Sequence, residues 1–282
     1  MDNSGGFTTP PPPPPPPGGE GGAGGPGLPP RGIGEILSTA FEIYKANAQN
    51  LLMIVAIIVV PLTFLSAFVG GVVFSPDTDP VTGLDDRALG AALLVGLLAL
   101  IIGVIINAVL QAALMRGSAQ GAIGDAVDID ASYKWGFARF GSVLLLSIVI
   151  GLIVGVGLVF LIIPGIWLWT MLSVAIPALV IENKRGTDAL SRSWNLVKGY
   201  FWHVLGTLVV AYLVTIVVGL VLGLLSSVFG DNWFISWIFN AIAQIITAPF
   251  MALVTVVLYL DLRARREALS ADALRGELNR SV

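Results

Sequence analysis

Cysteine is absent from this chain of 282 residues, histidine occurs once, and charged residues are scarce. Without cysteine there is no disulfide framework, no thiol chemistry and no cysteine-ligated metal. Asp, Glu, Lys and Arg make up 12% of the residues, against about a quarter in an ordinary soluble domain. Hydrophobic residues make up 56%, and the mean hydropathy is +0.88. These values indicate an integral membrane protein rather than a soluble domain.

Catalytic and nucleotide-binding motifs are also missing. The sequence contains no Ser/His/Asp arrangement, P-loop or dinucleotide fingerprint. The only histidine, His203, follows Trp202 at a predicted membrane boundary, and no carboxylate lies near it in sequence. A single imidazole cannot assemble a metal site, so we expect His203 to have a structural role. The chain is therefore predicted not to be an enzyme, with no cofactor, no metal and no nucleic-acid partner.

Residues 1–30 form a segment in which two-thirds of the residues are proline or glycine. Pro10 to Pro17 are consecutive prolines. Such a tract cannot bury enough apolar surface to fold, so we predict a disordered cytoplasmic tail with a stiff polyproline II stretch. A spacer is the expected role, and the alternative is docking on the aromatic groove of a partner protein.

Six apolar segments follow the tail, and none of them contains an ionisable residue. The predicted spans lie near residues 51–74, 91–115, 143–163, 166–181, 204–229 and 233–260. The fourth is short, and the others are long enough to cross the hydrocarbon core of a bilayer. Pro164-Gly165 is expected to form a tight turn between the third and fourth spans. Residues 31–267 are therefore predicted to form an all-α membrane domain, and residues 268–282 a charged C-terminal tail.

Lys and Arg are distributed unevenly between the two sides of this arrangement. One side carries 14 of the 15 cations, and Arg87 alone lies on the other. Because cytoplasmic loops carry an excess of Lys and Arg, this bias predicts the cytoplasmic membrane with both termini in the cytoplasm. Trp167 and Trp233 are then expected near the outer interface, and Trp194 near the inner one.

An amphipathic pattern precedes the odd-numbered spans. Its best-defined copy, residues 189–201, has an aromatic, apolar face and a basic, polar face. The defining residues of these faces are Leu190, Arg192, Trp194, Val197 and Lys198. Residues 35–45 repeat the pattern, and residues 132–140 form a weaker copy. We predict helices lying on the inner leaflet, with aromatic residues among the headgroups and cations in water. The fold class is thus six transmembrane helices as three hairpins, each preceded by a cytoplasmic-side amphipathic interfacial helix.

Uncharged polar side chains occur at helical spacing in the second and sixth spans. They are Asn107, Gln111, Asn240, Gln244 and Thr247. Hydrogen bonding between helices is the simpler interpretation, and an intramembrane polar groove for a lipid headgroup or a solute is the alternative.

Glycine pairs and terminal carboxylates give two further expectations. Gly151-x-x-x-Gly155 in the third span and Gly219-x-x-x-Gly223 in the fifth are spaced for close helix contact. Glu182 and Asp261 lie at the cytoplasmic ends of the fourth and sixth spans, where we expect water to reach them.

Three segments resemble a bacterial, largely actinobacterial, group of polytopic membrane proteins: GIGEILSTAFEIYKAN, GTDALSRSWNLVKGYFWHVLG and LYLDLRARREAL. This group is the glycerophosphoryl diester phosphodiesterase membrane-domain-like family, whose function is unsettled. The likeness covers residues 31 to about 270. In fusions, such a membrane domain precedes a TIM-type barrel that needs paired histidines and metal-binding carboxylates. With one histidine here, the resemblance implies the membrane module and not the enzymatic half.

Three functional hypotheses follow from these patterns. The first is a non-catalytic scaffold, or a partner- or lipid-interacting module, because it needs no residue that the chain lacks. The second is a transporter or lipid-handling protein that uses the polar faces of spans two and six. The third is a membrane subunit that works with a separate phosphodiesterase. All three predict the lipid bilayer as a partner, and none predicts an oligomeric state.

Overall fold

The computed structural model describes residues 29–73, 86–184, 186–230, 232–267 and 270–280. Over these residues the chain is helical and contains no strand. Six helical segments are long and apolar enough to cross a membrane, so the prediction of an all-α, multi-pass membrane protein is confirmed at this level. The predicted proline-rich tail lies outside the described residues, except for its last two.

The N-terminal amphipathic segment and the first span form separate helices. Helix α1 (Ile33–Ala46) begins after Gly32, whose N–H donates to the carboxylate of Glu35 at 2.8 Å. Helix α2 (Ala48–Val73) follows Asn47, whose side-chain amide donates to the Ile43 carbonyl at 3.2 Å. Helix α3 (Asp86–Ala122) continues beyond the predicted end of the second span at residue 115. Residues 116–122, which lie beyond that span, are therefore also helical.

Helix α4 (Ile129–Phe160) contains both the third amphipathic copy and the third span. Residues 132–140 are its first turns and not a separate surface helix, which corrects the prediction for this copy. Asp128 caps α4 by accepting a hydrogen bond from the Ala131 N–H at 3.0 Å. This cap starts the helix ahead of the amphipathic residues, so no break separates them from the apolar part.

The fourth span is broken into two helices, contrary to the prediction of one. Helix α5 (Ile162–Leu172) is separated from α6 (Ala175–Glu182) at residues 173–174. Pro177 explains the break, because a proline ring clashes with the carbonyl four residues earlier, which here belongs to Ser173. The Ser173 N–H instead donates to the Thr170 carbonyl at 3.3 Å, which closes α5.

The turn between α4 and α5 falls at Leu161 and not at Pro164-Gly165. Leu161 alone is non-helical there, with φ −159° and ψ 131°. Pro164 lies in the first turn of α5, where a backbone N–H would have no partner within the helix. A Cβ on Gly165 would lie 2.5 Å from the Leu158 side chain. The close approach of the two helices at this turn therefore requires a glycine.

The basic helix α7 (Thr187–Val197) is shorter than predicted. Gly199 has φ +93°, a left-handed conformation that ends the helix and allows α8 (Phe201–Ser227) to begin in a new direction. Helix α9 (Trp233–Glu267) and helix α10 (Ala271–Arg280) complete the order of elements.

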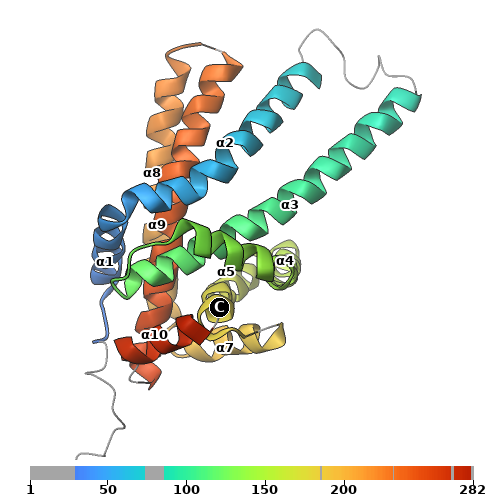
Figure 1. Ribbon diagram of the computed structural model, residues 1–282. Helices are drawn as coiled ribbons and strands as arrows, with labels where there is room; N and C mark the ends of the chain where they lie inside the picture. Colours follow the sequence, from blue (N-terminus) through green and yellow to red (C-terminus); the bar gives the residue numbers. More distant parts are fainter. Residues whose placement is uncertain (1–28, 74–85, 185, 231, 268–269, 281–282) are drawn as a thin grey trace, which may run out of the picture.

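Helix α9 lies at the centre of the molecule. It packs against α1, α2, α3, α6, α7 and α8, and its residues 252–254 and 256–263 are buried. In Figure 1, α8 and α9 run side by side, whereas α4 lies across their direction and packs along α3 and α5. The six apolar segments are therefore not all parallel to one another.

Glycines bring helices together at positions other than the predicted ones. A Cβ on Gly136 of α4 would lie 3.0 Å from the Val109 carbonyl oxygen of α3. At Gly151, Gly155, Gly219 and Gly223 an added Cβ would have nothing within 4 Å. The GxxxG prediction is thus wrong for contacts between described residues. Glycine spacing permits an approach between helices, but the packing of the surrounding side chains decides where it occurs.

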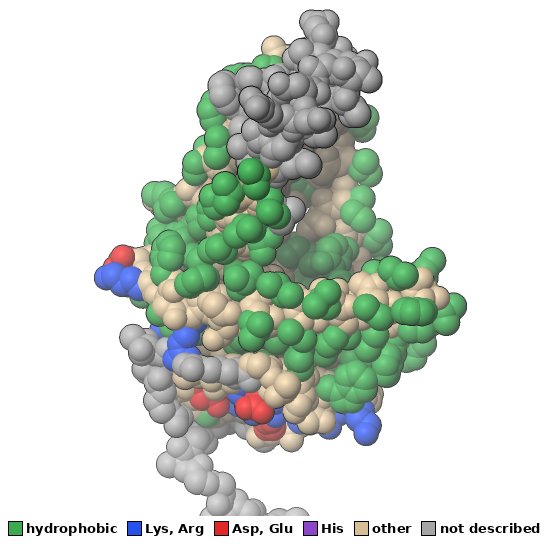
Figure 2. Space-filling view, turned by 90° about the vertical axis from the view of Figure 1, so that its right-hand side faces the viewer, with side chains coloured by type: hydrophobic (Ala, Val, Ile, Leu, Met, Phe, Trp, Pro, Cys, Tyr) green, Lys and Arg blue, Asp and Glu red, His purple; other side chains and the backbone are tan. Residues whose placement is uncertain are grey.

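Apolar side chains cover much of the surface, and charged ones gather toward one end. Figure 2 shows green side chains over the upper part and over a ridge at mid-height, with Lys, Arg, Asp and Glu in the lower half. The most exposed apolar residues of the described chain lie at the α4–α5 turn, where Val159 and Ile163 are more than four-fifths exposed.

Candidate functional site

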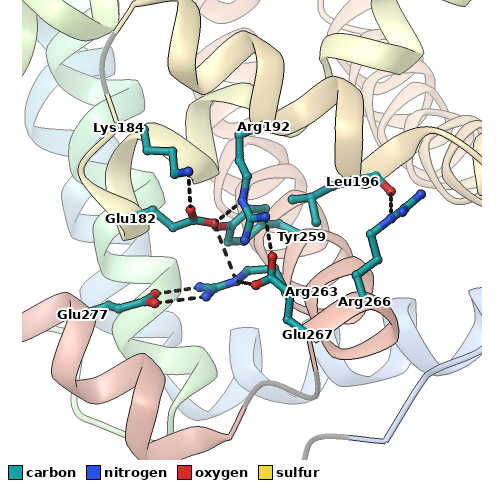
Figure 3. A network of polar contacts seen from close by, with 9 residues as sticks. All are labelled: Glu182, Lys184, Arg192, Leu196, Tyr259, Arg263, Arg266, Glu267 and Glu277. Atoms are coloured by element: carbon teal, nitrogen blue, oxygen red, sulfur yellow. Dashed lines mark hydrogen bonds and ion pairs between the residues drawn. The ribbon is translucent and has the colours of Figure 1, made fainter.

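A network of charged side chains joins four helices at the charged end of the molecule (Figure 3). Helices α6, α7, α9 and α10 supply its members, except for Lys184, which lies between α6 and α7. They are Glu182, Lys184, Arg192, Tyr259, Arg263, Glu267 and Glu277. Residues far apart in sequence therefore meet here around the end of α9.

Glu182, the last residue of α6, lies near the centre of this network. Its carboxylate accepts a hydrogen bond from Arg192 Nε at 2.7 Å and one from the Tyr259 hydroxyl. Lys184 Nζ lies 3.3 Å and Arg263 Nε 3.6 Å from the same carboxylate. Its side chain is only 9% exposed. The prediction that water reaches Glu182 is therefore wrong, because α7 and α9 fold over the end of α6.

Arg263 connects the C-terminal helix to this network. Its two terminal nitrogens donate to both oxygens of Glu277 at 2.6 and 3.0 Å, and its Nε donates to Glu267 at 3.1 Å. A bidentate pair of this kind is the strongest form of a charged hydrogen bond in proteins. Because Arg263 is itself buried, it fixes α10 against the rest of the domain.

Arg192 of α7 also points into the protein, which corrects the prediction that its cation lies in water. Its side chain is 17% exposed and bonds to Glu182 and Glu267. Burial alone would lower the pKa of Arg192, but the hydrogen bonds to these two carboxylates raise it overall. The guanidinium is therefore charged throughout the physiological range and serves as an internal tie between α7 and α9.

A second buried carboxylate, Asp261, ties the start of α1 to α8 and α9. It accepts hydrogen bonds from the Arg31 backbone N–H at 2.6 Å and from Arg265 Nε at 2.7 Å. His203 Nε2 lies 3.1 Å from Oδ2, the oxygen that also accepts the hydrogen bond from Arg265. Asp261 has no exposed side-chain surface, so the prediction that it is hydrated is also wrong. Sequence proximity could not reveal the contact with His203, because 58 residues separate the two.

Helix α7 turns its apolar face toward the protein. Ala189, Ser193, Leu196 and Val197 are buried, and the Ser193 hydroxyl donates to the Met171 carbonyl at 2.8 Å. Of the predicted interfacial residues, Leu190 packs partly against the core and Lys198 is exposed. The face expected among lipid headgroups is thus largely occupied by α5 and α9.

The Trp194 ring stacks edge-on against Trp167 of α5, with the ring centroids 5.0 Å apart. In the topology predicted from the sequence, Trp167 lies at the outer interface and Trp194 at the inner one, about 30 Å away across the hydrocarbon. The contact overturns that pair of assignments.

A cavity of about 430 Å³ lies where α3, α4, α5, α8 and α9 meet, and Ile176 of α6 also lines it. Its walls are mainly apolar, and none of its lining residues within the described chain is charged. The residues that contribute polar atoms are Gln111, Ser147, Trp169, Ser173, Tyr212 and Thr255. Gly151 and Gly155 also line it, which is why nothing lies close to them. Their spacing leaves an open volume rather than a helix contact.

Three hydrogen-bond donors in the cavity wall have no partner among the described residues. The Ser147 hydroxyl donates to the Gln111 side-chain oxygen at 3.1 Å. The Gln111 amide nitrogen has no acceptor among the described residues. The Trp169 indole and the Tyr212 ring contact each other at 5.4 Å, and neither polar atom has a hydrogen bond. The hydroxyls of Ser173 and Thr255 in the wall instead donate to carbonyls of their own chain segment, those of Thr170 and Met251.

The predicted polar groove is only partly assembled. Gln111 lines the cavity, but Asn107, Asn240 and Gln244 are exposed. Asn240 and Thr247 hydrogen-bond to carbonyls of their own helix. Sequence reasoning missed Trp169 and Tyr212, because aromatic residues in an apolar span are usually assigned to packing or to the membrane interface.

No family model matches the chain, and no curated protein or solved structure matches it either. Among the described residues, no three His, Asp or Glu side chains come together in a way that could hold a metal ion. The cavity and the ion-pair network are therefore interpreted from their own chemistry.

Proposed function

We propose that this chain is a non-catalytic multi-pass membrane protein that holds a lipid in the cavity between α3, α4, α5, α8 and α9. The observation that carries the proposal is the combination of apolar walls with unpartnered donors from Gln111, Trp169 and Tyr212. A donor without an acceptor is costly in an apolar environment such as the interior of a bilayer, so a ligand that supplies acceptors is favoured there.

The chemistry of the wall selects the class of ligand. Because no lining residue carries a charge that could offset a phosphate, these neutral donors favour the carbonyl oxygen of an acyl ester over a phosphate. The apolar remainder of the cavity wall fits an acyl chain. The volume lies within the range of known small-molecule sites, about 300–1,000 Å³. A neutral acyl ester, either a neutral lipid or the ester region of a phospholipid whose headgroup stays outside, satisfies both requirements.

The membrane setting of the proposal follows from the distribution of charge. Cations collect at the end formed by α1, α7 and α10, so this end faces the cytoplasm and both termini lie on that side. The α2–α3 and α8–α9 pairs cross the bilayer as hairpins, and α1 and α7 lie at its inner surface. The resemblance to the phosphodiesterase membrane-domain-like family agrees with such a module. The tail of residues 1–30 is proposed as a spacer.

The test fills the cavity with side chains of the protein itself. Gly151→Leu and Gly155→Leu each place an isobutyl group where an added Cβ meets nothing within 4 Å. The protein is purified from its membrane in a mild detergent, and bound lipid is identified by native mass spectrometry. The matched controls are Gly219→Leu and Gly223→Leu, which are equally open but do not line the cavity.

We expect the natural protein and both controls to retain an acyl-ester lipid, and the two cavity variants to lose most of it. Equal retention by cavity and control variants would contradict the proposal, because the lipid would then lie on the general apolar surface. Absence of any bound lipid from the natural protein, purified from membranes in lipid-like detergent and in nanodiscs, would also contradict it.

A further inference from the structure

The turn between α4 and α5 has no polar side chain that suits a water-facing loop. Between Ser147 and Thr170 no residue carries a hydroxyl, a side-chain amide or a charge. The turn between α8 and α9, by contrast, contains Asp231 and Asn232. A turn that emerges on the outer side of a membrane is expected to resemble the second and not the first.

The two tryptophans of α5 show how this helix is oriented. Trp167 and Trp169 are two residues apart, so they point about 200° apart around the helix axis. The Trp167 ring contacts Trp194 of α7, and the Trp169 ring contacts Tyr212 of α8 at 5.4 Å. Helix α5 is therefore held between α7 on one side and the apolar part of α8 on the other.

This placement leaves no room for α5 to start at the outer surface. Helix α7 belongs to the charged end of the molecule, where Arg192 bonds to Glu182 and Glu267. An outer interface would be about 30 Å from that end. The start of α5 contacts α7 directly, and Figure 1 shows α4 running across the direction of α8 and α9.

We propose that the α4–α5 pair does not cross the bilayer but lies within its inner leaflet, embedded among the acyl chains of the lipids. Only α2, α3, α8 and α9 then cross. Because four is even, as six is, both termini stay on the same side. The partner of this apolar pair is the lipid itself, which covers Val159, Ile163 and their neighbours at the turn.

Backbone hydrogen bonding at the turn suits this environment. Unpaired N–H and C=O groups are costly in hydrocarbon, which limits how irregular an embedded turn can be. Here the Leu161 N–H donates to the Gly157 carbonyl at 3.0 Å, and the Gly165 N–H donates to the Leu161 carbonyl at 3.2 Å. Pro164 has no N–H at all. A single non-helical residue thus leaves few groups to satisfy.

Crosslinking in native membranes distinguishes the two arrangements. The chain has no cysteine, so introduced pairs react alone. A short bis-maleimide is applied to Trp167→Cys with Trp194→Cys, and in a matched control to Trp167→Cys with Trp233→Cys. Trp233 begins α9 beside the outer turn. We expect the first pair to crosslink and the second not to. The reverse result would place α5 at the outer surface and overturn the proposal.

Cysteine labelling provides a second measurement at exposed positions, where substitutions usually change stability little. Ile163→Cys at the α4–α5 turn is compared with Val228→Cys near the α8–α9 turn, since the two residues are 81% and 78% exposed. A membrane-impermeant maleimide added from outside should label position 228 at least tenfold faster than position 163. Equal labelling from outside would show that α4 and α5 cross the membrane. This result is independent of whether a lipid occupies the cavity.

Discussion

Helices α8 and α9 form one pair of long apolar segments, and α4 and the α5–α6 segment form another. The apolar stretches of α8 and α9 have mean hydropathies of 2.9 and 2.2. Those of α4 and the α5–α6 segment have mean hydropathies of 3.0 and 1.8. In each pair, 11% of the residues of one apolar stretch and 50% of those of the other are buried inside the protein. Hydropathy and burial therefore do not separate the pairs. They differ in the polarity of the turn and in what the ends of the helices contact.

The ends show why the two pairs play different roles. Helix α9 continues beyond its apolar part into a charged segment, where Asp261 and Arg263 are buried by specific partners. Helix α5 is interrupted before α6, whose last residue, Glu182, joins the same network. Charged side chains thus join the two pairs at one end, whereas apolar contacts such as that of Trp169 with Tyr212 join them farther along. Beyond that end, lipid rather than protein surrounds much of both pairs.

The largest effect is expected from breaking the network of charged side chains at this end. Arg263→Met removes a buried cation and leaves Glu277 and Glu182 without it, which should cost about 3–5 kcal/mol of unfolding free energy. Unfolding in mixtures of mild and denaturing detergent measures the change. The control is Lys134→Met, because Lys134 forms an exposed pair with Asp130. Exposed pairs contribute little, so the control should cost under about 1 kcal/mol. Similar costs for both would mean that the network is not what joins the pairs.

A charge placed at each turn compares the two pairs directly. Ile163→Asp puts a carboxylate into hydrocarbon if the α4–α5 turn is embedded, at a cost of about 2–3 kcal/mol. Val228→Asp lies beside a polar turn and should cost under about 1 kcal/mol, because surface substitutions are usually mild. Thermal unfolding of both variants in nanodiscs gives the comparison. A larger loss at position 228 than at 163 would reverse the assignment of the two turns.

The smallest effect concerns the contact that orients α5. An edge-on tryptophan pair is worth about 0.5–1.5 kcal/mol beyond the area that it buries. A double-mutant cycle of Trp167→Leu and Trp194→Leu should recover a coupling energy of this size in the unfolding free energy. The corresponding cycle of Trp167→Leu and Trp233→Leu should show coupling near zero. Additivity in the first cycle would indicate that the two rings do not meet in the membrane.

Much of the helix content followed from the sequence, because apolar runs of this length have few alternatives to helix. The errors occurred where a local pattern met a distant partner. Arg192 was assigned to water from its place on a helical wheel, but Glu182 and Glu267 draw it inward. Pro177 was a local signal for the break after α5, and it was overlooked within an apolar run. The residues of the cavity wall come from six helices, so no local pattern could have grouped them.

The sequence by itself determined that this is a multi-pass helical membrane protein with its cations gathered toward one end. It did so because backbone groups in hydrocarbon must be satisfied within a helix and because charge avoids the bilayer core. Only the tertiary structure decided which carboxylates are buried, where the glycines leave space, and how α5 lies between α7 and α8. Those outcomes depend on contacts between residues tens of positions apart, and hydropathy along the chain carries no information about such contacts.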